Sequence, residues 1–309
     1  MSVLLEVNHL SISFLQYTRG FQQKKLNVVQ ELNVTVHAGE IVALVGSSGA
    51  GKSLLAHAIL GILPDSAETS GSIRYDGEEL TTARQAALRG REIALVPQSV
   101  NYLNPLMRVG EQVRTNRGDA KEAVKKQREI FERYGLGAEV ERMFPFQLSG
   151  GMARRILVST ASMSGAKLVI ADEPTPGLDA GVVKETLGFF KELADQGCGV
   201  LFITHDIEAA LQIAHKVAII YAGTTVETAR PDDFAGSGEK LRHPYSKALW
   251  RALPQNGFEP IPGFQPHPDA LPEGCRFAPR CPMATNECMN SLPEMRWLRG
   301  GSVRCIHAS

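Results

Sequence analysis

An apolar run at residues 41–45 (IVALV) leads directly into Gly46-Ser47-Ser48-Gly49-Ala50-Gly51-Lys52-Ser53, and this stretch decides the fold. The run is typical of a buried parallel strand, and a helix is expected over residues 52–63. The eight residues have the spacing GxxxxGKS, in which glycines let successive backbone N–H groups face phosphate oxygens. Lys52 would add charge at the β- and γ-phosphates, and the Ser53 hydroxyl suits Mg²⁺. The sequence therefore predicts a phosphate-binding loop between a strand and a helix.

Two adjacent carboxylates, Asp172 and Glu173, follow a second apolar run at residues 168–171 (LVIA). Asp172, at the end of a strand, could hold the Mg²⁺ shell. Glu173 lies one residue further along, where it could polarise an attacking water. Such a pair says little by itself, but together with the phosphate loop it predicts hydrolysis of a nucleoside triphosphate.

A third motif, Leu148-Ser149-Gly150-Gly151-Met152, lies upstream of the carboxylates and should begin a helix. Ser149 and the amides of Gly150 and Gly151 would form a second anion-binding helix end. A single nucleotide cannot be held by both ends within one chain. The sequence therefore predicts a dimer, in which each nucleotide lies between one chain's phosphate loop and the other chain's motif.

With this motif the chain resembles the ATP-binding cassette (ABC) family, whose other landmarks follow in order. Gln98, in VPQSV, matches the loop glutamine that senses Mg²⁺ and water. Asp179, in GLD, matches the D-loop, and His205, in FITHD, matches the switch histidine near the γ-phosphate. The resemblance implies ATP and Mg²⁺ as ligands. It implies three catalytic residues, Glu173, His205 and Gln98. It implies three residues around the Mg²⁺, namely Ser53, Gln98 and Asp172.

The same resemblance implies an α/β fold, the P-loop NTPase cassette with a RecA-like core, an antiparallel β subdomain and an α-helical subdomain. The cassette is expected over residues 1–230, with the helical subdomain at about 99–147. Family members usually stack a ring near the N-terminus on adenine, a contact that any ring face can make. Phe14, at the end of a strand predicted over 3–14, is the first choice and Tyr17 the alternative, while a plain core role for Phe14 stays open.

Three further stretches resemble the oligopeptide, dipeptide and nickel importers of that family. Residues 98–112 (QSVNYLNPLMRVGEQ) look like their glutamine-loop region, and residues 243–254, which begin HPYS and end LP, look like their helix after the cassette. The third stretch is the tail, GCRFAPRCPMATNEC with a final VRC. Met152 is similar to the D-type of the two ATPase subunits that these importers pair. Two departures, Arg154 in place of a common glutamine and Pro176-Gly177 in place of Thr-Ala, remove no catalytic group.

The resemblance implies an ATP-hydrolysing subunit that energises a binding-protein-dependent importer of peptides or a related solute such as nickel or a metal chelate. Its partners would be a second, different ATPase, two permease subunits and an extracytoplasmic solute-binding protein. The subunit would lie peripherally at the cytoplasmic face of the inner membrane and contact the permease through the loop at Gln98. The alternative is an ATPase of a soluble complex, such as one of phosphonate degradation, which gives no reason for the cysteine tail. Neither the cargo nor the relative activity of the two ATPases can be read from the sequence.

Prolines crowd the chain after about residue 230, so residues 231–309 are expected to be irregular apart from a short helix at about 245–253. Four of the five cysteines lie there: Cys275, Cys281, Cys288 and Cys305. A segment with little core needs a staple, and a reducing compartment favours a metal over disulfides. Four thiolates suit Zn²⁺ or an iron–sulfur cluster, and the resemblance favours [4Fe–4S], with zinc and unligated thiols left open. Cys198, before a buried strand, is expected to be inert packing.

Composition limits the partners. The 309 residues fit one large α/β domain with an appendage. Lys plus Arg and Asp plus Glu both number 33, so the formal net charge is zero and nucleic acid is not expected as a partner. No apolar run approaches about 18 residues, and Glu6 interrupts the start, so neither a membrane span nor a signal peptide is expected. Membrane association would therefore depend on another protein.

Overall fold

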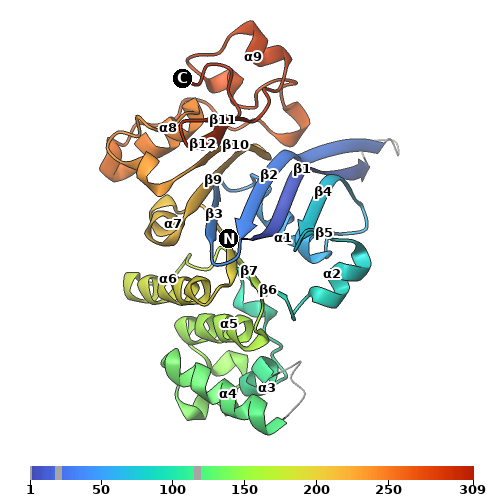
Figure 1. The fold of residues 1–309 in the computed structure, drawn as a ribbon, viewed down its shortest axis with the longest axis vertical. Coiled ribbons are helices and arrows are strands. Elements are labelled where there is room, and N and C mark those ends of the chain that lie inside the picture. The colour runs from blue at the N-terminus through green and yellow to red at the C-terminus, as the bar shows by residue number, and fades with distance from the viewer. Residues whose placement is uncertain (1, 18–22, 115–119) are drawn as a thin grey trace.

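Five parallel strands form the centre of the molecule (Figure 1). The computed structural model describes residues 2–17, 23–114 and 120–309. The five strands lie in the order β9 (Lys216–Tyr221), β3 (Ile41–Gly46), β8 (Gly199–Thr204), β7 (Leu168–Asp172) and β6 (Ile93–Val96). Every residue of β3, β7 and β8 is buried, as their apolar sequences predict. Because parallel strands end at the same edge, the phosphate loop after β3 and the carboxylates at the end of β7 are brought to one side of the sheet.

A second sheet shares a hydrophobic core with the first and with α1 (Lys52–Leu60). Its antiparallel strands lie in the order β2 (Gln23–His37), β1 (Val3–Tyr17), β4 (Ala67–Tyr75) and β5 (Glu78–Glu79), and α2 (Thr82–Leu88) follows them. Three of these strands are longer than the stretches predicted, 3–14, 34–37 and 73–75. The first half of β2 and most of β4 are exposed, so no apolar alternation marks them, and backbone pairing with β1 extends them. The helix α1 ends at Leu60 because Gly61 adopts a left-handed cap.

Helices gather at one end of the long axis of the molecule (Figure 1). They are α3 (Val109–Arg114), α4 (Ala120–Arg133) and α5 (Gly150–Ser164), with α6 (Ala180–Asp195) beside α5. The charge-rich stretch 120–134, whose apolar residues recur at the spacing that predicts a helix, forms α4, and its Ile130 and Phe131 are buried in the core of this part. The ring of Tyr134 packs against Phe189 of α6 at 4.2 Å between centroids. Helix α7 (Ile207–Ile213) belongs instead to the core under the C-terminal segment.

The C-terminal segment is more ordered than the expected irregular tail. After β10 (Thr224–Ala229) of the cassette, its elements are α8 (Pro244–Arg251), α9 (Asn286–Asn290), β11 (Arg296–Leu298) and β12 (Gly301–Val303). The β11–β12 hairpin pairs with β10 and so extends the central sheet to eight strands. The expectation that this segment has little core was also wrong, because Phe234, Tyr245 and Phe277 pack together with Tyr221 of β9. These aromatics lie far apart in the sequence, so no periodicity reveals them.

A buried ion-pair network fixes the segment to the sheet. The Arg242 guanidinium pairs with Glu227 of β10 at 3.1 Å and with Asp233 at 3.0 Å. Its remaining N–H groups donate to the backbone oxygens of Leu298 and Arg299 in the hairpin. Because these groups are buried, removing Arg242 would leave two carboxylates inside the protein without the cation that they share. The network therefore joins β10, the start of α8 and the hairpin.

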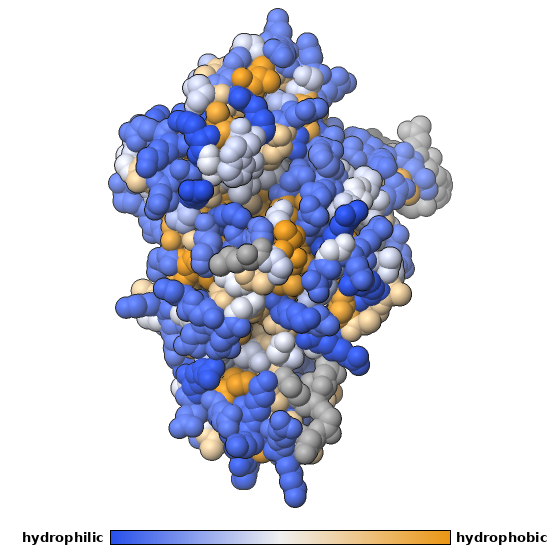
Figure 2. All heavy atoms as spheres, viewed as in Figure 1, coloured by the Kyte–Doolittle hydropathy of each residue, from blue (hydrophilic) through white to orange (hydrophobic). Residues whose placement is uncertain are grey.

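The surface is mostly hydrophilic on the face shown in Figure 2, with hydrophobic residues in small, separate groups. Within the part of the chain that the structure describes, no helix has the length and apolar character needed to cross a membrane. The large exposed apolar side chains include three in the helical part, Tyr102, Leu106 and Phe146. Leu106 is 89 % exposed, which is unusual for a residue of its type.

Candidate functional site

The predicted phosphate loop connects β3 to α1, as the sequence indicates. Gly51 lies just before α1 with φ +85°, and a Cβ placed there would lie 2.6 Å from Val29 of β2. At Gly46 a Cβ would lie 2.5 Å from the backbone oxygen of Ile220. Both positions therefore require glycine, one for its conformation and the other for the close approach of β9. Since neighbours enclose the loop on both sides, its path is set by the two sheets as well as by its own sequence.

Lys52 is buried at the base of this loop and contacts both the loop and a carboxylate. Its Nζ donates to the backbone oxygens of Gly46 at 2.8 Å and Ser47 at 3.1 Å. The Glu173 carboxylate lies 3.6 Å away. Burial lowers the pKa of Lys52, while the nearby Glu173 and Asp172 carboxylates oppose that shift. The ammonium group is thus held where the sequence places the phosphate charge.

Ser53 and Asp172 lie together, as a shared Mg²⁺ would require. The Ser53 hydroxyl donates to Asp172 Oδ1 at 3.1 Å. Burial raises the pKa of Asp172, and the hydrogen bond from Ser53 opposes this rise. A hydroxyl and a buried carboxylate form an oxygen donor set of the kind that Mg²⁺ prefers, so these residues fit the ion.

Glu173 and His205 also meet. Glu173 Oε2 accepts from His205 Nδ1 at 2.9 Å, while Oε1 faces Lys52. The backbone of Glu173 is left-handed, with φ +46°, a conformation that costs a non-glycine residue about 1–3 kcal/mol. Its N–H donates to Ile203 of β8 at 2.9 Å, which helps to hold that conformation. The sheet therefore aims the Glu173 carboxylate between a cation and an imidazole, as an activating base requires.

The glutamine loop is held by the residue that departs from the family pattern. Gln98 is exposed, and its backbone oxygen accepts from Arg154 Nη2 at 2.9 Å. Arg154 Nη1 donates to the backbone oxygen of Pro97 at 2.8 Å. Sequence reasoning noted Arg154 only as a departure. In the structure, Arg154 is a residue of α5 whose side chain binds the backbone of the glutamine loop.

The other motif residues begin helices. Ser149 caps α5, with its hydroxyl accepting from the Met152 N–H at 3.2 Å, and Gly150 and Gly151 form the first turn. Asp179 caps α6 in the same way, accepting from Val182 at 3.1 Å. Across residues 2–17, 23–114 and 120–309, no hydrogen bond or ion pair joins the Ser149 motif to the phosphate loop. The dimer predicted from the two separate helix ends remains a prediction.

Phe14, the residue predicted to stack on adenine, belongs to β1 of the second sheet. Phe14 pairs with Leu26 and Ala67 in the second sheet and packs against that core. The side chain of Tyr17 lies outside the described residues. The β2 residue next to Gly51 is the aliphatic Val29. The stacking role of Phe14 therefore remains a prediction, and its packing favours the core role that the sequence left open.

Two C-terminal residues that sequence reasoning did not select reach the phosphate loop. The Ser47 hydroxyl donates to Gln265 Oε1 at 2.5 Å. Tyr245 of α8 lies beside Ser47: burial raises the pKa of Tyr245 to about 12, and Ser47 opposes that rise. No local pattern could reveal Gln265, which lies in a proline-rich stretch far along the chain. Tyr245 was noticed only as part of HPYS.

The four tail cysteines lie in one neighbourhood without forming a metal site. The Cys275 N–H donates to the backbone oxygen of Cys288 at 2.8 Å. A single 3-10 turn, Ala278–Arg280, lies between Cys275 and Cys281. Burial raises the thiol pKa of Cys275, Cys281 and Cys305, and mutual repulsion of the sulfurs adds to each rise. Among the residues that the structure describes, no group of three or more His, Cys, Asp or Glu residues is arranged to hold a metal ion. All the cysteines are free thiols.

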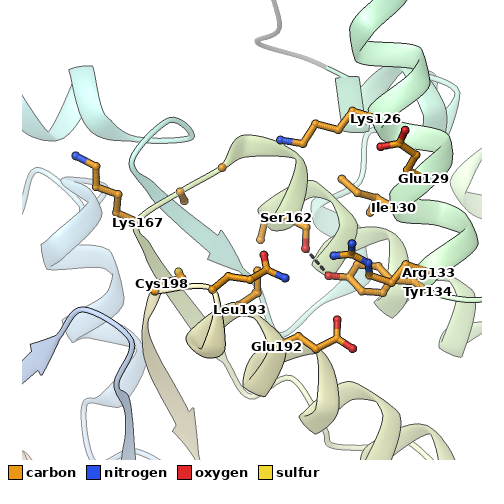
Figure 3. Close-up of a pocket in the computed structure, with 15 residues that line it drawn as sticks. Lys126, Glu129, Ile130, Arg133, Tyr134, Ser162, Lys167, Glu192, Leu193 and Cys198 are labelled. Carbon is orange, nitrogen blue, oxygen red and sulfur yellow. Dashed lines mark hydrogen bonds between the residues drawn. The ribbon is translucent and has the colours of Figure 1, made fainter. Parts of the chain in front are cut away.

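A cavity of about 490 Å³ lies away from these motifs, between α4, α5 and α6 (Figure 3). Side chains of both signs surround it, including Lys126, Arg133 and Glu192, and the Tyr134 hydroxyl is bonded to Ser162. Cys198 lies at its edge but is buried, and burial raises its thiol pKa to about 12. This agrees with the expectation that Cys198 is inert packing. The cavity contains none of the motif residues.

The loop, the Ser53–Asp172 pair, the Glu173 carboxylate and the second helix-end motif define the chain as a P-loop ATPase of the cassette class. The ABC transporter family matches residues 29–176, and the oligopeptide/dipeptide transporter C-terminal region matches residues 226–288. The chain belongs to the ABC transporter family, in the branch that carries this C-terminal region.

Similarity to named relatives extends over nearly the whole chain. An oligopeptide transport ATP-binding protein, AppD of Bacillus subtilis, is 34 % identical over 99 % of this chain and 97 % of its own length. OppD of Salmonella typhimurium is 35 % identical over 94 % of this chain and 90 % of its own length. OppD of Mycobacterium tuberculosis is 36 % identical over 96 % of this chain but only 50 % of its own length.

Solved structures support the fold. The dimeric structure of MJ0796, a bacterial ABC transporter cassette, has a TM-score of 0.64 at 22 % identity and covers 74 % of this chain and 99 % of its own. An ATP-binding subunit of an ABC transporter has a TM-score of 0.60 at 26 % identity, and covers 75 % of this chain and 91 % of its own. The predicted cassette fold is therefore confirmed.

Proposed function

We propose that this ATPase energises the uptake of peptides by a binding-protein-dependent ABC importer. One observation carries the proposal: residues 226–288 match the oligopeptide/dipeptide transporter C-terminal region, in a chain whose cassette keeps each motif residue. The names of full-length relatives refer to oligopeptide transport or peptide import. Peptides are thus the favoured cargo. None of these relatives is named for nickel, the alternative cargo suggested by the sequence.

Hydrolysis follows from the geometry of the site. The loop amides and Lys52 bind and neutralise the phosphates, and Glu173 accepts a proton from the water it orients. His205, bonded to Glu173, lies where it could hold that carboxylate in position and contact the phosphate side of the site. Mg²⁺, when bound, would be held by Ser53 and Asp172 with Gln98 nearby, and would offset charge on the phosphates.

The proposed partners are a second, different ATPase, two permease subunits and an extracytoplasmic solute-binding protein. The second ATPase would supply a helix-end motif like that at Ser149 to this chain's loop. The permease would contact the loop that begins at Gln98, where Val100, Tyr102, Leu106 and Met107 are exposed. Such a cluster of exposed apolar residues suits a protein interface. The chain would then lie peripherally at the cytoplasmic face of the inner membrane.

Peptide uptake by cells that carry the Glu173→Gln variant tests the proposal. The variant should bind ATP, assemble with the permease chains and fail to take up labelled peptide. Leu106→Asp should instead keep ATP binding and weaken co-purification with the permease, while Ile306→Asp, at an exposed apolar residue of the tail, serves as the control. Normal uptake by Glu173→Gln, or an ATPase that purifies with soluble proteins and no permease, would contradict it and favour the soluble alternative.

We also propose that Cys275, Cys281, Cys288 and Cys305 bind a [4Fe–4S] cluster, with zinc as the alternative. Their shared neighbourhood supports this, and because burial raises the pKa of three of the thiols, metal binding would have to release those protons. Their present arrangement would have to change for all four to bind one ion. Anaerobically purified protein should absorb broadly near ~400 nm and lose that band in Cys288→Ser but not in Cys198→Ser. Colourless protein with stoichiometric zinc would contradict the cluster.

A further inference from the structure

Two side chains of the C-terminal segment converge on one residue of the phosphate loop. Gln265 Oε1 accepts the Ser47 hydroxyl proton at 2.5 Å. Tyr245, from α8, lies beside Ser47, which opposes the rise that burial causes in the Tyr245 pKa. Both come from outside residues 29–176, where the ABC transporter family matches. The segment is therefore in direct contact with the ATP site.

The backbone oxygen of Ser47 binds two other residues of that loop. Its backbone oxygen accepts from Lys52 Nζ at 3.1 Å and from the Ala50 N–H at 3.2 Å. Holding the Ser47 side chain thus also holds the turn that closes on Ala50 and the direction of the Lys52 ammonium group. A loop fixed in its binding shape loses less conformational freedom when it closes on phosphates, so it binds them more tightly.

Gln265 is not a loosely attached side chain, because its own stretch is tied down. The Arg280 guanidinium donates to the backbone oxygens of Pro262 at 2.6 Å and Ile261 at 3.0 Å. It also donates to the Tyr221 hydroxyl at 3.1 Å, and Tyr221 belongs to β9 of the central sheet. The stretch that carries Gln265 is therefore anchored to the same sheet that carries the phosphate loop.

Tyr245 is anchored even more firmly. Its side chain is buried, and its ring lies 4.5 Å from Tyr221 and 5.4 Å from Phe277 between centroids. Aromatic pairs at such distances stabilise their packing beyond the apolar area that they bury. The ring cannot swing away from Ser47 without opening this core. Tyr245 is thus fixed beside the loop residue to which Gln265 is hydrogen-bonded.

We propose that Gln265 is a positioning residue of the ATP site, which holds Ser47 so that the phosphate loop is preformed, and that Tyr245, fixed beside Ser47, supports it. The C-terminal segment would then contribute to ATP affinity, a role separate from any contact with a permease. The proposal rests on the ATP site of the family and not on the cargo or on the metal proposed for the cysteines. Its experiment can therefore fail while those proposals stand.

Titration of the full-length chain with Mg·ATP tests this role. Gln265→Ala should weaken ATP binding about two- to tenfold, the effect expected for one lost hydrogen bond. The hydrolysis rate at saturating ATP should change by less than about twofold, because the lost contact orders the loop and does not touch the reacting atoms. Tyr245→Phe, which removes a single oxygen, should act in the same direction. Gln255→Ala, at an exposed glutamine of the same segment, is the matched control.

A double-mutant cycle separates positioning from a general effect on folding. Ser47→Ala removes the hydroxyl donor and leaves the loop backbone in place. Gln265→Ala made in that background should weaken ATP binding no further, since its partner is already gone. Equal ATP affinities for Gln265→Ala and Gln255→Ala would overturn the proposal, and so would effects that add fully in the Ser47→Ala background. If Gln265→Ala does not fold, the same cycle with Tyr245→Phe decides the question.

Discussion

Arg154 donates from Nη2 to the backbone oxygen of Gln98 at 2.9 Å, so the helix that begins at the Ser149 motif directly holds the glutamine loop. Arg154 is 5 % exposed, and burial lowers its pKa. Among the described residues no carboxylate forms an ion pair with Arg154. Its guanidinium group donates hydrogen bonds to the backbone oxygens of Pro97 and Gln98 instead. A shift of α5 would therefore be transmitted to Gln98, and through Gln98 to the proposed permease contact.

Arg154→Met should slow ATP hydrolysis about tenfold while leaving ATP affinity within about twofold. The variant removes two charge-assisted hydrogen bonds, each worth about 1.5–3 kcal/mol, from the glutamine loop, for which a role in catalysis is proposed. Glutamine is the residue common at this position in the family, and Arg154→Gln can keep only part of this contact. Its hydrolysis rate should lie between those of the parent and of Arg154→Met. Steady-state hydrolysis and ATP titration measure the two quantities. Arg155→Met, which breaks a partly exposed pair with Glu185, is the control, and an equal slowing in both variants would contradict the role of Arg154.

Glu173→Gln should lower the hydrolysis rate by at least about 100-fold with ATP binding retained, because an amide cannot take the proton of the attacking water. His205→Ala should have a smaller effect, since Glu173 would keep its strained backbone and its contact with Lys52. Rapid-quench measurement of phosphate release over one turnover separates these steps. Glu185→Gln, on the surface of α6, is the control, and rapid release by Glu173→Gln would show that another group activates water.

Sequence patterns predicted what is local and periodic. The strand-loop-helix unit around Lys52, the carboxylates after β7 and the charged helix α4 all depend on neighbours along the chain, and each is found. The hairpin β11–β12 and the core around Tyr221 and Phe277 depend on contacts between distant residues, which no local period reveals. For the same reason Gln265 was missed, and the spacing of the cysteines alone could not decide whether they bind a metal. The motif positions thus followed from sequence, whereas the links between motifs required the fold.

Asp172→Asn should raise the melting temperature in Mg²⁺-free buffer at pH 7, although it should abolish Mg²⁺-dependent hydrolysis. Burial raises the pKa of Asp172 in the folded chain, so the folded state keeps this proton to a higher pH than the unfolded state does. The resulting stabilisation is complete below the unfolded pKa, about 3.9, and is lost as the pH rises through the folded pKa. Asparagine cannot ionise and can still accept from Ser53, so it avoids that loss. Thermal melts at pH 4 and pH 7 should show the gain only at pH 7, and a variant less stable at pH 7 would refute this account.

His243→Asn should remove part of the acid sensitivity of the chain. His243 is fully buried, burial lowers its pKa to about 3, and its Nδ1 accepts from the Tyr245 N–H at 3.0 Å to cap α8. An unfolded histidine takes a proton below a pH of about 6.5, so the stabilisation is present above that pH and is lost as the pH falls toward 3. Asparagine also caps helices but does not titrate in this range.

Denaturant unfolding between pH 7 and pH 4 measures this difference. Below about pH 6 the parent chain should lose up to about 1.4 kcal/mol per pH unit more than His243→Asn. His267→Asn is the matched control, because His267 caps a short turn through the same ring nitrogen but is exposed. If the free energy of unfolding falls equally with pH in the parent and in His243→Asn, protonation of His243 does not destabilise the folded state, and this account is wrong. Because α8 also carries Tyr245, the same acid range should weaken ATP binding before the whole chain unfolds, if Tyr245 positions Ser47 as proposed.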